Sequence, residues 1–265
     1  MVKAKDFKRK IPHNEYTFMN EGAKKVGIIN KLDKEITHNV LPVTKKSLVL
    51  EKGGFFSSIN DTFTEITVAK FVMPFMLGGA FLFLAVSFTI ILATADYSIN
   101  NNEPITAYIV ATIIFYLIFI LFLVYSVTMP PKECLFNRQD SLITIPGFMW
   151  YKNITMPFSE IAFSFTQPSA QGIGAYQLNI LRPDKMFSQY LMTTGRSCYE
   201  DLSFFVWYMD KNRPLPPGDA FDEFRERDFE RRKAEGFPKP LFPARFETPE
   251  HTPEQQAERE RIGGW

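Results

Sequence analysis

The residues that most often bind metals or attack substrates are few in this chain and far apart. Its histidines are His13, His38 and His251. None has another histidine or a cysteine at the short spacing that metal sites use. The chain also has no Gly-x-Ser-x-Gly nucleophile turn and no Gly-x-x-x-x-Gly-Lys-Ser/Thr phosphate loop. The sequence therefore predicts no metal, no cofactor, no evident small-molecule substrate and no enzymatic activity, although a triad built from distant residues stays open.

The two cysteines, Cys134 and Cys198, do not form a Cys-x-x-Cys pair. Both lie in a part of the chain for which the charge pattern, described below, predicts a cytoplasmic location. A reducing compartment disfavours a structural disulfide. We interpret both residues as small buried apolar side chains, and a redox or nucleophilic role is the alternative.

Basic residues gather in one segment, residues 219–235 (DAFDEFRERDFERRKAE), and acidic residues alternate with them there. Arginines and carboxylates three or four positions apart on a helix can pair. A nucleic-acid site would instead need a clear excess of positive charge. We therefore interpret the segment as a solvated, self-paired helix and predict no nucleic-acid partner.

Aromatic side chains are concentrated in two segments that could bind a protein. The first segment holds Phe148, Trp150, Tyr151, Phe158, Phe163 and Phe165. The second is interrupted by prolines. Aromatic residues dominate the anchors of protein interfaces, although core packing with a few rings touching lipid is the other interpretation of the first segment. The candidate binding residues are Trp150, Tyr151, Phe237, Phe242 and Phe246.

Two long apolar runs constrain how the rest of the chain can be arranged. Residues 71–95 and 104–131 contain no charged residue. A bilayer core needs about 20 apolar residues of helix. We predict a transmembrane helical hairpin over residues 68–131, with spans at about 71–95 and 105–128. Its predicted helix–helix contacts are those of Gly78, Gly79 and Ala80 with Ala107 or Ala111. Buried helices of a soluble protein are the alternative, but these usually keep a polar face that residues 105–127 lack.

The lysines and arginines around the hairpin indicate its orientation. Lys52 and Lys70 precede the first run, and Lys132 and Arg138 follow the second. The connector, residues 96–103, contains no basic residue. Because basic residues near the membrane ends stay in the cytoplasm, both termini are expected there. In a bacterium, such a chain is a multi-pass protein of the inner membrane.

After the hairpin, the pattern changes to short apolar strands followed by one helix. Strands are predicted at residues 133–136, 141–145, 149–155, 160–166, 176–181 and 187–193. Ser197 and Glu200 form a capping-box sequence before an apolar run, and the prolines after Arg213 end the helix. Residues 132–212 are therefore expected to form a cytoplasmic α+β domain.

Two polar segments flank these parts. Residues 1–67 are expected to be a polar cytoplasmic arm, in which residues 47–50 and 63–68 add either a strand or a juxtamembrane helix. Residues 213–265 are expected to be a proline-rich and charged helical tail, an appendage with a helix at 219–235 ended by Gly236. Its proline-interrupted residues 237–249 suggest an extended strap across another surface. Thr252, Pro253 and Gln255 have the spacing of a helix N-terminus.

Two short motifs in this order resemble a known group of proteins. The motifs are Phe136-Asn137-Arg138 after the second span and Pro157-Phe158-Ser159-Glu160-Ile161 further on. Over about residues 71–212 the chain resembles bacterial two-span membrane proteins with a pleckstrin-homology-like cytoplasmic domain, and an uncharacterised group of these associated with type VI secretion effectors. The resemblance implies a small β-barrel with a C-terminal capping helix, and it brings no catalytic residues.

These observations lead to two expected functions. The first is a non-enzymatic binding module anchored in the inner membrane, with the lipid bilayer and a protein as its partners. The resemblance implies a more specific version, an immunity or accessory protein to a secreted toxin. The alternative is a structural subunit of a larger membrane complex, such as a secretion complex.

Overall fold

A computed structural model describes residues 13–15, 31–40, 42–45, 56–66, 72–94, 105–166, 176–183, 189–192 and 197–265. The predicted element at residues 47–50 lies outside these ranges. The chain divides into two compact units. One unit contains the apolar hairpin together with Gly147–Lys152, and the other contains the β-sheets and the C-terminal helices.

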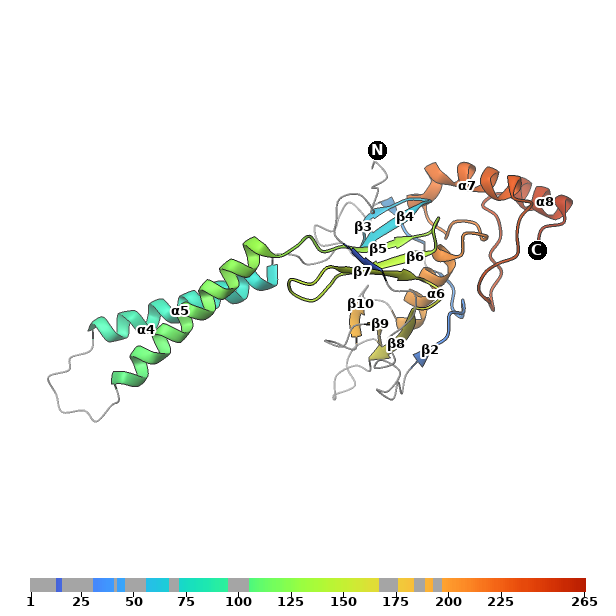
Figure 1. Ribbon diagram of the computed structural model, residues 1–265. Helices are drawn as coiled ribbons and strands as arrows, with labels where there is room; N and C mark the ends of the chain where they lie inside the picture. The colour runs from blue at the N-terminus through green and yellow to red at the C-terminus, as the bar shows by residue number, and fades with distance from the viewer. Residues whose placement is uncertain are drawn as a thin grey trace. The chain divides into compact units, whose positions relative to one another are not determined.

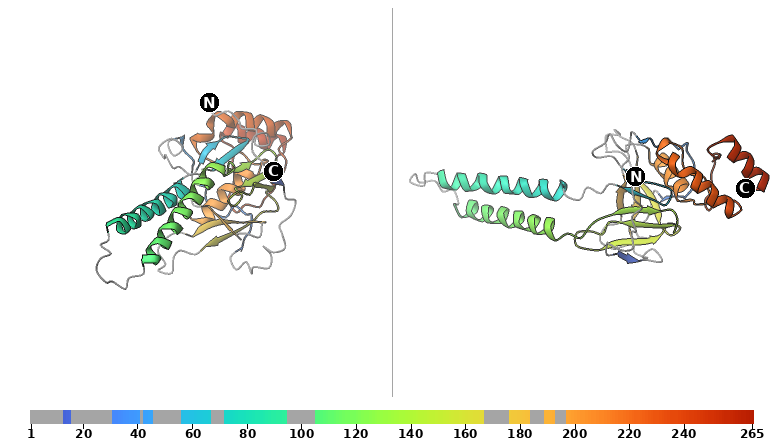
Figure 2. Two further views of the ribbon diagram at one scale, coloured as in Figure 1. Left: turned by 60° about the vertical axis from the view of Figure 1, so that its left-hand side comes forward. Right: turned by 90° about the horizontal axis from the view of Figure 1, so that it is seen from above.

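Two helices, α4 (Val72–Thr94) and α5 (Ile105–Thr128), run side by side in the first unit (Figures 1 and 2). Both are long and apolar enough to cross a membrane, so the two predicted spans are confirmed as helices of that kind. Serine and threonine hydroxyl groups of both helices donate to carbonyl oxygens one turn earlier in the same helix, as Ser87 does to Phe83 at 2.9 Å. In an apolar environment this internal bonding is required, because no water is present to accept the bond.

Phenylalanine rings and one glycine make the contact between α4 and α5. Phe81 stacks on Phe122 with ring centroids 5.9 Å apart. A Cβ added to Gly78 would lie 3.2 Å from the Cβ of Phe122. The predicted contact of Gly78 with Ala107 or Ala111 is therefore wrong. In an antiparallel hairpin the beginning of the first helix meets the end of the second.

The larger sheet of the second unit has six strands in the order β1-β7-β6-β5-β4-β3. Their bounds are β1 (His13–Glu15), β7 (Asn153–Pro157), β6 (Leu142–Ile145), β5 (Cys134–Asn137), β4 (Phe63–Ile66) and β3 (Phe56–Ile59). β1 and β7 are parallel, and every other pair is antiparallel. Ile66 pairs with Cys134, so the α4–α5 hairpin is inserted between two neighbouring strands. Of the two structures open for residues 63–68, a strand is formed over the described part, Phe63–Ile66. The expected boundary at residue 67 separates strands that pair.

The smaller sheet is antiparallel, with the order β10-β9-β8-β2. Its strands are β10 (Gln189–Met192), β9 (Gln177–Leu181), β8 (Ala162–Thr166) and β2 (Lys31–Leu32). Among the described strands neither sheet closes on itself. The predicted combination of an apolar hairpin with an α+β region is therefore present, while the barrel is not confirmed.

Helix α6 (Cys198–Met209) begins with the predicted capping box. The Ser197 hydroxyl accepts a bond from the Glu200 amide at 3.3 Å. On one side, Phe205 stacks on Phe136 of β5 at 4.5 Å. The opposite side is also buried, because the C-terminal segment covers it, and the Trp207 indole donates to the Pro214 carbonyl oxygen at 2.7 Å. Helix α6 is therefore buried on both sides.

The residues expected to form an appendage pack onto this same unit. They contain the short helix η1 (Asp219–Phe221), α7 (Asp222–Ala234) and α8 (Pro253–Ile262). The predicted cap of α8 is present, with the Thr252 hydroxyl 3.2 Å from the Gln255 amide. The strap crosses the chain's own Ile36, whose amide donates to Pro243 at 3.0 Å and whose carbonyl accepts from Arg245 at 2.9 Å.

Candidate functional site: a charged cleft

An open cleft of about 560 Å³ lies in the sheet-containing unit. Four segments that are distant in the sequence form it: the β3–β4 turn, the β5–β6 turn, the end of α6 and one side of α7. The residues that line it are all polar or charged: Asp61, Thr62, Arg138, Gln139, Asp140, Lys211, Arg227, Arg231 and Glu235. Charged side chains of both signs therefore face one space.

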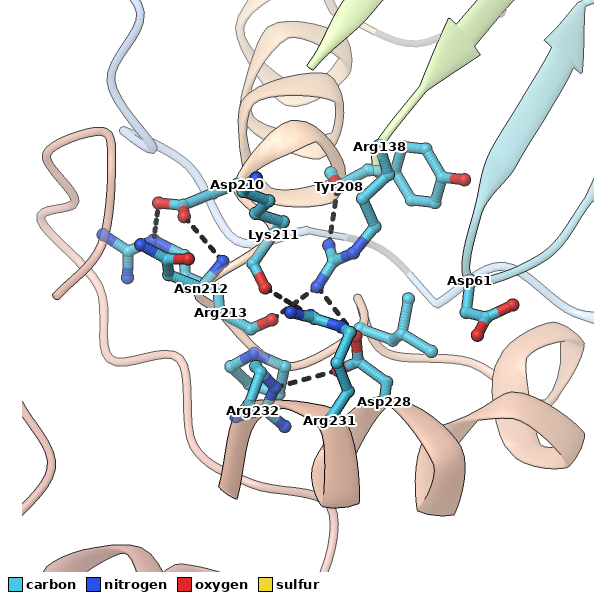
Figure 3. Close-up of polar contacts among 12 residues, drawn as sticks. Asp61, Arg138, Tyr208, Asp210, Lys211, Asn212, Arg213, Asp228, Arg231 and Arg232 are labelled. Carbon is cyan, nitrogen blue, oxygen red and sulfur yellow. Dashed lines mark hydrogen bonds and ion pairs between the residues drawn. The ribbon is translucent and has the colours of Figure 1, made fainter. Parts of the chain in front are cut away.

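Arg138 forms the floor of the cleft. It follows β5 in a turn held by the Asp140 amide, which donates to the Asn137 side chain at 3.0 Å. The Arg138 side chain is only 1% exposed. Its guanidinium donates to the carbonyl oxygens of Tyr208 at 2.5 Å and Arg213 at 2.6 Å (Figure 3). Because this buried guanidinium group is bonded to backbone carbonyl oxygens, the floor of the cleft is rigid.

Asp228 of α7 is a buried carboxylate that pairs with two arginines of the cleft lining. It lies 3.3 Å from Arg138, 3.0 Å from Arg231 and 2.9 Å from Arg232 (Figure 3). Burial by itself would raise the pKa of Asp228, but the three guanidinium groups outweigh it and lower this pKa below its ordinary value. Asp228 is therefore ionised at neutral pH and holds three arginines in place.

A second carboxylate, Glu250, extends this network away from the cleft. Arg232 donates to its two oxygens at 2.6 and 2.7 Å, in the bidentate geometry that is the strongest form of this pair. Arg259 of α8 reaches the same carboxylate at 3.1 Å and lies over the Trp265 ring. The network thus connects α8 through α7 to the turn after β5.

The rim of the cleft is accessible to solvent. Arg227 binds Asp61 through both carboxylate oxygens. Lys211 is only partly buried, and its ammonium group has no hydrogen bond or ion pair with any residue that the structure describes. Among the residues that the structure describes, the rim therefore presents the ammonium group of Lys211 without a bonded partner, beside the paired Arg227 and Asp61.

The residues predicted to bind a partner are divided between the two units. Trp150 and Tyr151 belong to the hairpin unit and are exposed. Phe237 is 2% exposed, because it packs against Phe229 of α7, and its role in binding stays a prediction. Phe242 packs edge-on against Phe158, and Phe246 is exposed on the strap.

The sequence contained a signal for this site, but we interpreted it differently. The charged segment was expected to be a solvated helix with its own ion pairs. Such pairs exist, for example Arg231 with Glu235 at 3.0 Å, but Arg225, Asp228 and Arg232 are buried. Alternating charges cannot reveal which members face a buried arginine from another segment.

Among the described residues there is no group of three or more histidine, cysteine or acidic side chains placed to hold a metal ion. The free cysteines Cys134 and Cys198 are both buried. Comparison of the chain with family models, with curated proteins and with solved structures finds no match to any of them.

Proposed function

We propose that this protein is a non-enzymatic binding module anchored in a bacterial inner membrane, and that its charged cleft receives part of a protein partner. In this proposal α4 and α5 are the membrane anchor, and both termini lie in the cytoplasm. The cleft is the observation that carries the proposal, because it presents the unpaired ammonium group of Lys211 on walls held by buried ion pairs.

The mixture of charges in the cleft favours a protein over a nucleic acid. Arg227 and Lys211 are accompanied by Asp61, Asp140 and Glu235. A nucleic-acid site needs a net positive surface that displaces counterions. A surface with both signs instead recognises a partner with the complementary pattern, which contributes specificity and speeds association.

The rigidity of the walls also favours binding. Arg138 and Arg231 each make several bonds to groups that belong to the fold, so little side-chain freedom remains to be lost when a partner binds. Preorganised charges therefore contribute more to affinity than flexible surface lysines would.

The identity of the partner rests on the resemblance alone. It favours a secreted toxin that the protein neutralises, or assists as an accessory protein, at the inner face of the membrane. The proposed pleckstrin-homology-like domain would consist of the two sheets followed by α6 as its capping helix. Closure into a barrel would need pairing between the sheets, which the described strands do not make.

The second candidate function is a structural subunit of a larger membrane complex. The observation that favours it is the apolar side chains exposed along α5, such as Leu117 and Leu121, which other helices could cover as well as lipid. Helix packing on this scale would make the protein inseparable from other integral subunits in mild detergent.

Affinity purification of the tagged full chain from its native membrane tests the two functions together. A soluble or secreted protein recovered in a fixed ratio supports the binding module. Recovery of several integral membrane proteins in fixed ratios, with a matching native mass in detergent, supports the structural subunit. A bare monomer in both measurements contradicts both proposals.

A further inference from the structure

The segment Gly147–Lys152 forms a tight loop that belongs to the hairpin unit, not to the sheets that flank it in sequence. The Tyr151 amide donates to the Phe148 carbonyl oxygen at 2.8 Å and closes a turn. A Cβ on Gly147 would collide with the carbonyl oxygens of Tyr151 and Lys152, so only glycine fits where the two ends of the loop meet. The loop therefore has a defined shape that projects the side chains at its tip.

This loop is attached to the last turn of α5. The Trp150 indole nitrogen donates to the Thr128 hydroxyl at 2.7 Å, and its ring meets the Tyr125 ring edge-on at 5.0 Å. The Lys132 ammonium group donates to the Tyr151 carbonyl oxygen at 2.5 Å. Trp150 thus packs against the last turn of α5, where its indole nitrogen bonds a hydroxyl group and its ring contacts another aromatic ring.

The tip of the loop exposes three large side chains in succession. Met149 is 42% exposed, Trp150 44% and Tyr151 60%. Met149 also has φ of 44°, in the left-handed region where glycine or asparagine would be less strained. The loop tip therefore carries a large apolar side chain at a position where glycine would be less strained.

We propose that Met149, Trp150 and Tyr151 are a membrane-interface anchor that inserts into the boundary between lipid headgroups and acyl chains. Tryptophan and tyrosine are enriched at this depth because their rings are apolar and their edges are polar. The bilayer is the occupant, because the tip continues the apolar surface of α5 at its end. The inference rests on the proposed anchoring by α4 and α5.

Quenching of tryptophan fluorescence by brominated lipid tests this anchor directly. The full chain would carry Trp207→Phe and Trp265→Phe, which leave Trp150 as the single tryptophan, in nanodiscs of phosphatidylethanolamine and phosphatidylglycerol. Bromine would be placed either near the headgroup end or near the middle of the acyl chains. The reference is the same chain with Trp150→Phe and Leu117→Trp, which puts the single tryptophan on an exposed position near the middle of α5.

The expected result is that shallow bromine reduces Trp150 emission to about half, while deep bromine quenches the Leu117→Trp probe more strongly. Emission from Trp150 that is equal in brominated and ordinary discs, with the Leu117→Trp probe quenched, overturns the anchor and leaves the spans intact. A Leu117→Trp probe that also escapes quenching overturns the membrane anchoring itself. If the chain lacking Trp207 and Trp265 does not fold, the difference in quenching between the natural chain and Trp150→Phe supplies the same quantity.

Discussion

The guanidinium group of Arg138 and the carboxylate of Asp228 form a buried ion pair at 3.3 Å, although the two residues are 90 positions apart. One lies directly after β5 and the other lies on α7. The C-terminal segment therefore supplies the negative charge that pairs with the buried Arg138 of the sheet region. Both parts belong to one compact unit.

Replacing Asp228 by alanine is expected to lower the free energy of unfolding by about 3 to 5 kcal/mol, because Arg138 would lose its buried counter-charge and Arg232 would lose one of its two buried partners. Pulse proteolysis of the full chain in nanodiscs over a urea series measures this loss. Arg261→Ala is the control, because that arginine pairs at the surface with Glu258 and exposed pairs contribute little. Equal effects of the two substitutions would contradict the role of the buried pair.

Arg232 and Glu250 are expected to act as one unit. Each single substitution, Arg232→Met or Glu250→Met, leaves a buried charge without its bidentate partner. The double variant should therefore be more stable than the sum of the single losses predicts, with a coupling of about 2 kcal/mol. Urea unfolding of all four chains measures this coupling, and strict additivity would show that the pair is not coupled.

Acidification is expected to destabilise the sheet-containing unit through Asp228. Its pKa is lowered in the folded state, so the folded protein binds fewer protons than the unfolded chain as the pH falls below the ordinary value of 3.8. The stabilisation by Asp228 is therefore complete near neutral pH and is lost below about pH 4. Urea midpoints between neutral pH and pH 3 should fall more steeply for the natural chain than for Asp228→Asn, and parallel curves would refute this.

The two adjacent glycines of α4 should respond differently to a larger side chain. Gly78→Leu places atoms against Phe122, whereas nothing lies within 4 Å of a Cβ at Gly79. Overpacking at Gly78 is expected to destabilise the hairpin by about 1 to 3 kcal/mol, and Gly79→Leu should have a small effect. The midpoints of thermal unfolding in nanodiscs test this, and a lower midpoint for Gly79→Leu than for Gly78→Leu would be inconsistent with the observed packing.

Cys198 is expected to resist thiol reagents in the folded protein. Burial, together with the nearby carboxylate of Asp201, raises the pKa of its thiol to about 11, so very little thiolate is present at pH 8. Maleimide labelling should be slow until urea is added, as for a buried apolar side chain. Fast labelling of Cys198 in the native protein would instead support the alternative of a reactive thiol.

Local elements of this fold were predictable from the sequence because their signals are local. The uncharged runs predicted α4 and α5, and Ser197 with Glu200 predicted the beginning of α6. Pairing across the hairpin was not predictable. The short apolar run at residues 63–68 does not indicate that it pairs with the strand Cys134–Asn137, because α4 and α5 separate the two in the sequence.

The charged cleft was less predictable for a related reason. Its residues come from four segments, and each segment taken alone resembles an ordinary polar turn or a solvated helix. What distinguishes Asp228 from its acidic neighbours is that it faces Arg138, and this depends on tertiary packing. The prolines of the strap correctly predicted a non-helical segment, but no local signal indicated that this segment crosses Ile36.

The most direct test of the proposed function is to purify the natural chain and the Lys211→Glu variant from the native membrane and compare the proteins recovered with each. Lys239→Glu is the control, because it makes the same change of charge at an exposed position that does not line the cleft. The expected result is a partner in fixed ratio that the natural chain and Lys239→Glu retain and Lys211→Glu loses. Retention of the same partner by all three chains would contradict binding through the cleft.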